Sequence, residues 1–119
     1  MIYGLGIDAT DIARVVAAQE RNIDFAAKVL TPKELAFYQT LKERRAAEFL
    51  AGRFSVKEAY SKAFGTGLGK VQLQDVETLN NEAGKPVITK HPFDGKAFVS
   101  ITHTDTLVFT EVILERSEA

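Results

Sequence analysis

The sequence FSVKEAYSKAFGTG, residues 54–67, predicts the last turns of a long helix followed by a short glycine-flanked loop. Small and apolar residues recur there at helical spacing and predict a packed face. Polar residues three and four positions apart predict a second, polar face. The packed face would hold Phe49, Gly52, Val56, Ala59, Tyr60 and Ala63, and the polar face Arg53, Lys57, Glu58, Ser61 and Lys62. We expect the helix to end at Gly65, so that a carboxylate, several cations and free backbone amides surround one patch, as a metal-assisted phosphate site requires.

A simpler interpretation of the same stretch is an ordinary exposed helix end. Glu58 and Lys62, four residues apart, could form a surface ion pair worth about 0.3–0.5 kcal/mol. Gly65 could be a plain C-terminal stop. Spacing alone favours this simpler interpretation, so the hypothesis of a phosphate site depends on the rest of the chain.

Composition predicts one globular domain spanning residues 1–119. Hydrophobic residues at 45% and charged residues at 26% are typical of a soluble protein. The absence of cysteine excludes disulfides, thiol catalysis and cysteine-ligated zinc. Neither a membrane-length apolar run nor a basic-then-apolar opening is found, which predicts a cytoplasmic protein that does not bind membranes.

The charge is unevenly distributed along the chain. A net charge of −1 argues against general nucleic-acid binding. Residues 42–70 nevertheless carry seven basic and three acidic side chains. A local basic patch on a nearly neutral protein favours a small anionic ligand over a long polyanion.

The order of the predicted elements indicates the fold class. A strand over residues 2–8 contains two glycines, where another segment is expected to approach the backbone closely. Thr31, Pro32 and Glu34 form a capping-box start for a short helix. The other predicted elements are helices over residues 11–21 and 44–64 and strands over 71–79, 87–89, 97–102 and 107–114, the last two forming a hairpin. Helices early and strands late predict an α+β fold, with a mostly antiparallel sheet packed against one long central helix plus short helices.

Two carboxylates could create a metal site. Asp8 ends the first predicted strand, and Glu58 lies in the long helix. Two carboxylates, phosphate oxygens and waters make a typical magnesium site. Asp8 could instead cap the following helix, and a Gly-Thr-Gly loop is weak evidence alone.

His103 is the second candidate for chemistry, because it follows a predicted strand and lies beside two threonines. It could bind a phosphate or take part in proton transfer. The alternative is a hydrogen-bonded turn residue.

Four blocks of this sequence resemble the holo-[acyl-carrier-protein] synthases, the small stand-alone class of 4'-phosphopantetheinyl transferases. The blocks are Gly6-Ile-Asp8 followed by Arg14, residues 54–67 in the pattern F-x-x-K-E-A-x-x-K-A-x-G-T-G, Gly84-Lys-Pro86, and Val99-Ser-Ile-Thr-His-Thr104. The resemblance covers nearly the whole chain, and the second block is highly specific. It implies Mg²⁺-dependent transfer of 4'-phosphopantetheine from coenzyme A to a serine of apo acyl carrier protein, in fatty acid biosynthesis.

The resemblance also implies roles for particular residues. Asp8 and Glu58 would bind Mg²⁺. Beyond the resemblance, we expect Glu58 and Lys62 to be catalytic, with Lys62 stabilising charge beside the attacked phosphorus. Arg14 matches the carrier-docking position, and Arg21 lies on the same predicted helix face. Coenzyme A would contact Arg53, Lys57, Lys62, Gly65, Thr66, Lys85, Pro86, His103 and Thr104. The general base stays open among Glu58, Lys62 and a magnesium-bound water.

Assembly is predicted from the last strand. Leu107, Phe109 and Ile113 line one face, while Val108, Val112 and Leu114 line the other. A strand of an antiparallel sheet with one solvent-exposed face would alternate apolar and polar residues. This strand does not, so we expect both of its faces to be buried. A second subunit could supply it, and the resemblance implies a homotrimer whose sites combine Asp8 and Glu58 of one chain with His103 of the next.

Two other classes of function remain. A magnesium-dependent nucleotide pyrophosphatase would need a positioned water but no docking surface. A non-catalytic coenzyme A-binding module would need no metal-binding carboxylates.

Overall fold

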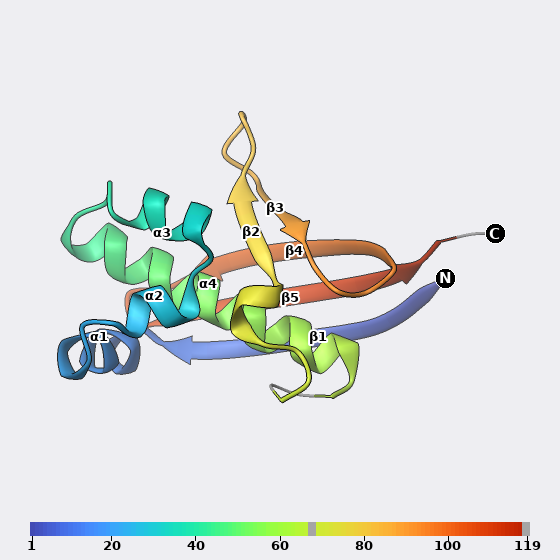
Figure 1. Cartoon of the computed structure of the whole chain (residues 1–119), viewed down its shortest axis with the longest axis horizontal. Helices are drawn as coiled ribbons and strands as arrows, with labels where there is room; N and C mark the ends of the chain where they lie inside the picture. The colour runs from blue at the N-terminus through green and yellow to red at the C-terminus, as the bar shows by residue number, and fades with distance from the viewer. Residues whose placement is uncertain (67–68, 118–119) are drawn as a thin grey trace.

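Helix α4 (Glu43–Phe64) lies across one face of a three-stranded antiparallel sheet, as Figure 1 shows. The computed structural model describes residues 1–66 and 69–117. Its other elements are β1 (Ile2–Asp11), α1 (Ile12–Arg21), α2 (Phe25–Val29), α3 (Pro32–Tyr38), the 3₁₀ turn η1 (Leu73–Asp75), β2 (Glu77–Asn80), β3 (Pro86–Lys90), β4 (Gly95–His103) and β5 (Leu107–Arg116). The predicted α+β fold is therefore confirmed, while α2 has no counterpart among the predicted elements.

The main sheet has the strand order β1-β5-β4, and the predicted hairpin of the last two strands is confirmed. In its register Asp8 lies opposite Thr110. Strands β2 and β3 pair in a separate two-stranded sheet.

The strand predicted over residues 71–79 is shorter than expected. It begins only at Glu77, because residues 73–75 form the turn η1. The Asp75 carboxylate accepts a hydrogen bond from the Gln72 amide at 2.9 Å and closes this turn. The Lys57 ammonium group donates hydrogen bonds to the carbonyls of Leu73 and Val76, so these carbonyls are unavailable to a β-ladder.

The predicted close approach to the two glycines of β1 is confirmed. A Cβ added at Gly4 would lie 1.9 Å from the Ala63 carbonyl oxygen, and one at Gly6 would lie 1.9 Å from that of Ala59. Only glycine lets α4 cross the strand this closely.

The middle of α4 is buried on nearly every side, which contradicts the predicted polar face. Arg53, Lys57 and Ser61 are at most 5% exposed. The main sheet packs on one side of α4. On the other side, Arg53 and Lys57 contact polar groups of α3, η1 and β2. Between residues 50 and 63, only a stripe of Phe54, Glu58 and Lys62, spaced four apart, is not buried. The predicted packed face is buried, with Phe49 partly so.

The ends of α1, α3 and α4 follow the predicted signals. Thr31 and Glu34 form the expected capping box. Gly65 ends α4 in the left-handed conformation, at φ 97°. Asp11 caps α1, at the predicted helix start, and the alternative in which Asp8 caps this helix is wrong, because β1 continues three residues beyond Asp8. Among the described residues, no helix has the length and apolar composition needed to cross a bilayer.

Candidate active site

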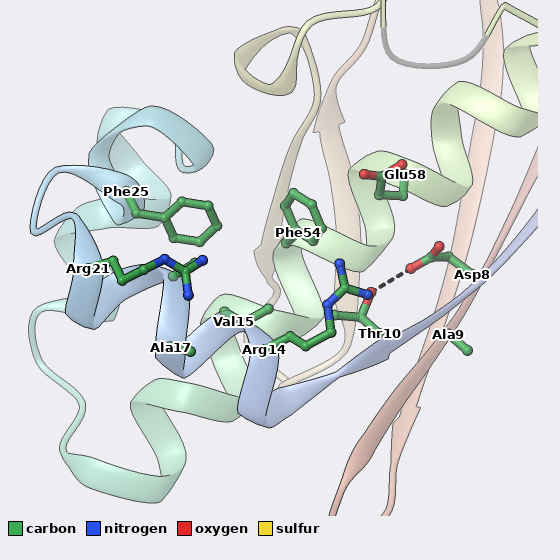
Figure 2. Close-up of a pocket in the computed structure, with 11 residues that line it drawn as sticks. Asp8, Ala9, Thr10, Arg14, Val15, Ala17, Arg21, Phe25, Phe54 and Glu58 are labelled. Atoms are coloured by element: carbon green, nitrogen blue, oxygen red, sulfur yellow. Dashed lines mark hydrogen bonds between the residues drawn. The ribbon is translucent and has the colours of Figure 1, made fainter.

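A pocket of about 500 Å³ opens between β1, α1, α2 and the exposed stripe of α4 (Figure 2). Arg14 and Arg21 project into it from α1, while Asp8 and Glu58 reach it from β1 and α4. Its lining comprises Asp8, Ala9, Thr10, Arg14, Val15, Ala17, Ala18, Arg21, Phe25, Phe54 and Glu58. The two predicted metal-binding carboxylates and the two predicted docking arginines therefore share one pocket.

Asp8 is held on the inner face of β1 by three side chains. Its Oδ2 atom accepts hydrogen bonds from Thr10 Oγ1 at 2.6 Å, drawn in Figure 2, and from Ser55 Oγ at 2.7 Å. Its Oδ1 atom lies 3.3 Å from the ammonium group of Lys62. That ammonium group also donates to the carbonyl of Ile7 at 3.0 Å, which places a cation beside the carboxylate.

Glu58 lies near Asp8 and makes no hydrogen bond or ion pair through its carboxylate with the residues that the structure describes. Burial raises the pKa of Glu58, the charge of Asp8 raises it further, and the charge of Lys62 opposes both. The two carboxylates thus repel each other, and a cation bound between them would relieve this repulsion.

This donor set fits magnesium. The described residues contain no cluster of three or more His, Cys, Asp or Glu side chains suited to a metal. Two carboxylates still suffice for Mg²⁺, which keeps several waters and takes further oxygens from substrate phosphates.

Lys57 and Arg53 do not line the pocket, although the sequence predicts them beside Glu58. The Lys57 ammonium lies 2.9 Å from Glu34 Oε1, and both side chains are 1% exposed. Arg53 stacks over Phe49 and donates to the Thr78 carbonyl at 3.0 Å. Both cations are turned inward because buried acceptors of α3, η1 and β2 are available there.

The remaining predicted coenzyme A contacts lie outside this pocket. His103 ends β4, is half-exposed, and has its Nδ1 atom 3.6 Å from Glu48 Oε2. Thr104 accepts hydrogen bonds from two amides of the β4–β5 turn, those of Thr106 and Leu107. Lys85 and Pro86 lie at the start of β3. Within one chain, these residues do not join Asp8 and Glu58.

The predicted phosphate-binding loop follows α4. Gly65 caps the helix, and Thr66 is the next residue. The third member of the predicted loop, Gly67, lies outside the described residues.

Sequence reasoning missed the hydroxyl groups around Asp8. Thr10 was detectable, because residues two apart on a strand share a face. Ser55 and Thr110 required the packing of α4 and the register of β5, which no local pattern provides. Phe25 was missed together with α2.

Comparisons with known proteins identify the family of this chain. Residues 4–114 match the family model described as the 4'-phosphopantetheinyl transferase superfamily, and the chain belongs to this family. A holo-[acyl-carrier-protein] synthase from Lacticaseibacillus casei strain BL23 is 72% identical over 116 residues, covering 98% of this chain and 94% of the relative. The enzyme of the same name from Latilactobacillus sakei subsp. sakei strain 23K is 60% identical over 116 residues, covering 98% and 99%.

A solved structure gives the same result. The holo-(acyl-carrier-protein) synthase from Bacillus anthracis strain Ames, in complex with CoA (3',5'-ADP), has a TM-score of 0.92 to this chain at 39% identity, with 98% of this chain and 99% of that one covered. The resemblance to holo-[acyl-carrier-protein] synthases that the four sequence blocks indicate is therefore confirmed.

Proposed function

We propose that this chain transfers 4'-phosphopantetheine from coenzyme A to a serine of an apo acyl carrier protein, at the pocket of Asp8 and Glu58. The activity rests on its family and on relatives named for this reaction. The observation that carries the location is the pocket itself, where two carboxylates face two arginines. The products would be holo acyl carrier protein and adenosine 3',5'-bisphosphate, and the reaction would take place in the cytoplasm.

Asp8 and Glu58 would hold the magnesium ion. When bound, it would supply positive charge to the pyrophosphate oxygens of coenzyme A. Lys62 would stabilise the charge that develops at the transferred phosphoryl group, since its ammonium already lies beside Asp8 at the open end of the stripe. The carrier serine would attack the β-phosphorus in line with the departing adenosine 3',5'-bisphosphate.

Arg14 and Arg21 would receive the carrier protein. Both line the pocket from α1, so a docked carrier would place its serine near the carboxylates. Acyl carrier proteins are acidic as a family, and complementary charge favours association and orientation.

Coenzyme A would contact Lys62, Gly65 and Thr66 of one chain and Lys85, Pro86, His103 and Thr104 of a neighbouring chain. Arg53 and Lys57 would support this site from the interior, because their charged groups already have partners there.

A homotrimer would bring these two groups together. The sheet face opposite α4 exposes large apolar side chains, namely Leu5, Ile7, Phe98 and Phe109, at 37–57% exposure. In the strand register Leu5 and Phe98 both lie opposite Ile113, so these side chains form one continuous surface. An exposed apolar surface of this kind is typical of a protein interface.

Mixed assembly tests the shared site. Glu58→Gln and His103→Ala proteins, each weakly active alone, should regain part of the activity when unfolded together and refolded as a mixture. Some mixed trimers would contain sites built entirely from unmutated residues. A monomer by light scattering, or no recovery in a mixture that contains mixed trimers, would refute the shared site.

Incubation with coenzyme A, Mg²⁺ and apo carrier protein, followed by intact mass of the carrier, tests the proposed reaction. We expect the carrier to gain one 4'-phosphopantetheinyl group only when all components are present. A nucleotide pyrophosphatase would consume coenzyme A and leave the carrier mass unchanged. A binding module would change neither the amount of coenzyme A nor the mass of the carrier. Either result would refute the proposal.

A further inference from the structure

A chain of hydroxyl groups lies behind the Asp8 carboxylate. We propose that Ser55, backed by Thr110, is a positioning residue that fixes Asp8 for metal binding. This inference rests on the proposed function, because it assumes that Asp8 binds the metal. It adds a residue of α4 and a residue of β5 that touch neither metal nor substrate.

The hydroxyl chain joins three elements of the fold. Asp8 and Thr110 lie opposite each other in the β1–β5 ladder, and Ser55 reaches them from α4. Ser55 Oγ lies 2.7 Å from Asp8 Oδ2 and 2.7 Å from Thr110 Oγ1. Ser55 is 0% exposed and Thr110 is 2% exposed, so water does not compete for these hydrogen bonds.

The direction of the hydrogen bonds follows from the chemistry of the groups. An ionised carboxylate only accepts hydrogen bonds, so Ser55 donates its single hydroxyl proton to Asp8. Ser55 can therefore only accept from Thr110, whose hydroxyl must be the donor. Both protons point toward Asp8, and each hydrogen bond in such a chain polarises and strengthens the next.

The two carboxylate oxygens of Asp8 have different partners and can serve different functions. Oδ2 accepts from both Thr10 and Ser55, which uses its two lone pairs. Oδ1 accepts a hydrogen bond from the exposed Lys62 ammonium at 3.3 Å and keeps its second lone pair for a metal cation. Ser55 also precedes Glu58 by three residues on α4, so the same hydrogen bond fixes the distance between the strand and the helix that carry the two carboxylates.

A purely structural role predicts a different outcome from a positioning role. If Ser55 only tied α4 to the sheet, its loss would lower stability and leave metal affinity unchanged. If it positions Asp8, its loss weakens metal binding in protein that is fully folded. Groups that orient metal ligands typically contribute 10–100-fold to metal affinity.

The test is Mn²⁺ binding to the full-length protein, measured by electron paramagnetic resonance without coenzyme A or carrier. We expect Ser55→Ala to weaken Mn²⁺ binding about 10-fold. In the transfer assay, the Mg²⁺ concentration for half-maximal rate should rise to a similar extent, while the KM for coenzyme A at saturating Mg²⁺ stays unchanged. The matched control is Ser61→Ala, which removes another buried serine hydroxyl of α4, one that donates to the Glu58 backbone carbonyl.

A second variant covers the case in which Ser55→Ala does not fold. Ser55→Ala/Thr110→Val removes both hydroxyls, so that neither is left buried beside a missing partner. It should bind Mn²⁺ as weakly as Ser55→Ala. Wild-type Mn²⁺ affinity in the folded single or double variant would overturn the positioning role.

Asp8→Asn separates this failure from a failure of the proposed metal site. If Asp8→Asn loses Mn²⁺ binding while the serine variants keep it, only the role of Ser55 is wrong. If Asp8→Asn also binds Mn²⁺ normally, the metal site itself is wrong, and the inference falls with it.

Discussion

Lys57 and Lys62 lie five residues apart on α4, and each contacts a carboxylate, yet their surroundings are opposite. Lys57 is 1% exposed and is paired with Glu34, which is equally buried. Lys62 is 54% exposed and lies beside Asp8, which lines the pocket. One helix thus carries a closed charge network on its inner side and an open one along its exposed stripe.

The closed network is fully partnered. The Lys57 ammonium contacts Glu34 and the carbonyls of Leu73 and Val76. Glu34 also accepts from the amides of Thr31 and Thr78. Burial lowers the pKa of Lys57, and the charge of Glu34 opposes this effect. Since buried charges without partners are very costly, this network is suited to fixing the orientation of α4.

The open network contains charged groups that are not fully paired within the described residues. Glu58 is repelled by Asp8 and lacks a partner among the described residues. More than half of the Lys62 side chain is exposed to water. Unsatisfied charges of this kind reduce stability and are typical of functional sites.

The largest expected effect comes from breaking the closed network. Lys57→Met should lower the free energy of unfolding by about 3–5 kcal/mol, because Glu34 is left buried without its cation. Lys62→Met should change it by about 1 kcal/mol or less, as expected for an exposed ion pair. Urea denaturation at pH 7 measures both values. Adding Glu34→Gln to Lys57→Met should recover part of the loss, since no unpaired charge then remains. Equal effects of the two lysine substitutions would contradict the comparison.

A smaller effect is expected at the docking surface beside the open network. Arg14→Glu or Arg21→Glu should raise the KM for the carrier about tenfold, equivalent to about 1.4 kcal/mol, because the charge facing an acidic partner is reversed. The KM for coenzyme A should change little. The wild-type KM for the carrier should also rise with salt, since exposed charges are screened over about 8–10 Å.

Lys90→Glu is the control for this prediction, because it reverses an exposed cation of β3 that does not line the pocket. A carrier KM that responds to Lys90→Glu as strongly as to Arg14→Glu would point to net charge rather than to a defined docking surface.

The smallest effect concerns pH and the inner side of α4. The Tyr60 hydroxyl lies 3.0 Å from His91 Nδ1, and burial lowers the pKa of His91. His91 therefore binds a proton more readily in the unfolded chain than in the folded one. Its contribution to the free energy of unfolding is fully present above about pH 6.5 and is lost as the pH falls through the lower pKa of the folded state. Urea denaturation from pH 7.5 to 5 should show a smaller decline for His91→Gln than for wild type. An identical decline in both proteins would exclude His91 as the cause.

The fold was predictable where local chemistry determines it. Thr31 and Glu34 define the start of α3, Gly65 ends α4, and Gly4 and Gly6 mark the close helix crossing. Which polar residues of α4 are buried and which are exposed was not predictable from local sequence. Helical spacing groups Lys57 with Glu58, but only tertiary structure supplies Glu34 and the η1 carbonyls that draw Lys57 inward.

The residues of the candidate site also divide into those that local sequence predicts and those that depend on tertiary structure. Asp8 and Glu58 were predicted from a strand, a helix and a highly specific motif, and the structure brings them to one pocket. Ser55 and Thr110 carry no sequence signal for their contact with Asp8, because that contact depends on the register of β5 and on the depth at which α4 packs.

The central claim is that the carboxylates of the open network perform the chemistry while the closed network holds the helix. The most direct test is the intact mass of apo carrier protein incubated with coenzyme A, over a range of Mg²⁺ concentrations, with wild type, Asp8→Asn or Glu58→Gln. We predict that both variants unfold at the same temperature as wild type or higher and modify the carrier at least about 100-fold more slowly, since metal polarisation is worth several kcal/mol. Near-normal rates in both folded variants at low Mg²⁺ would contradict the account.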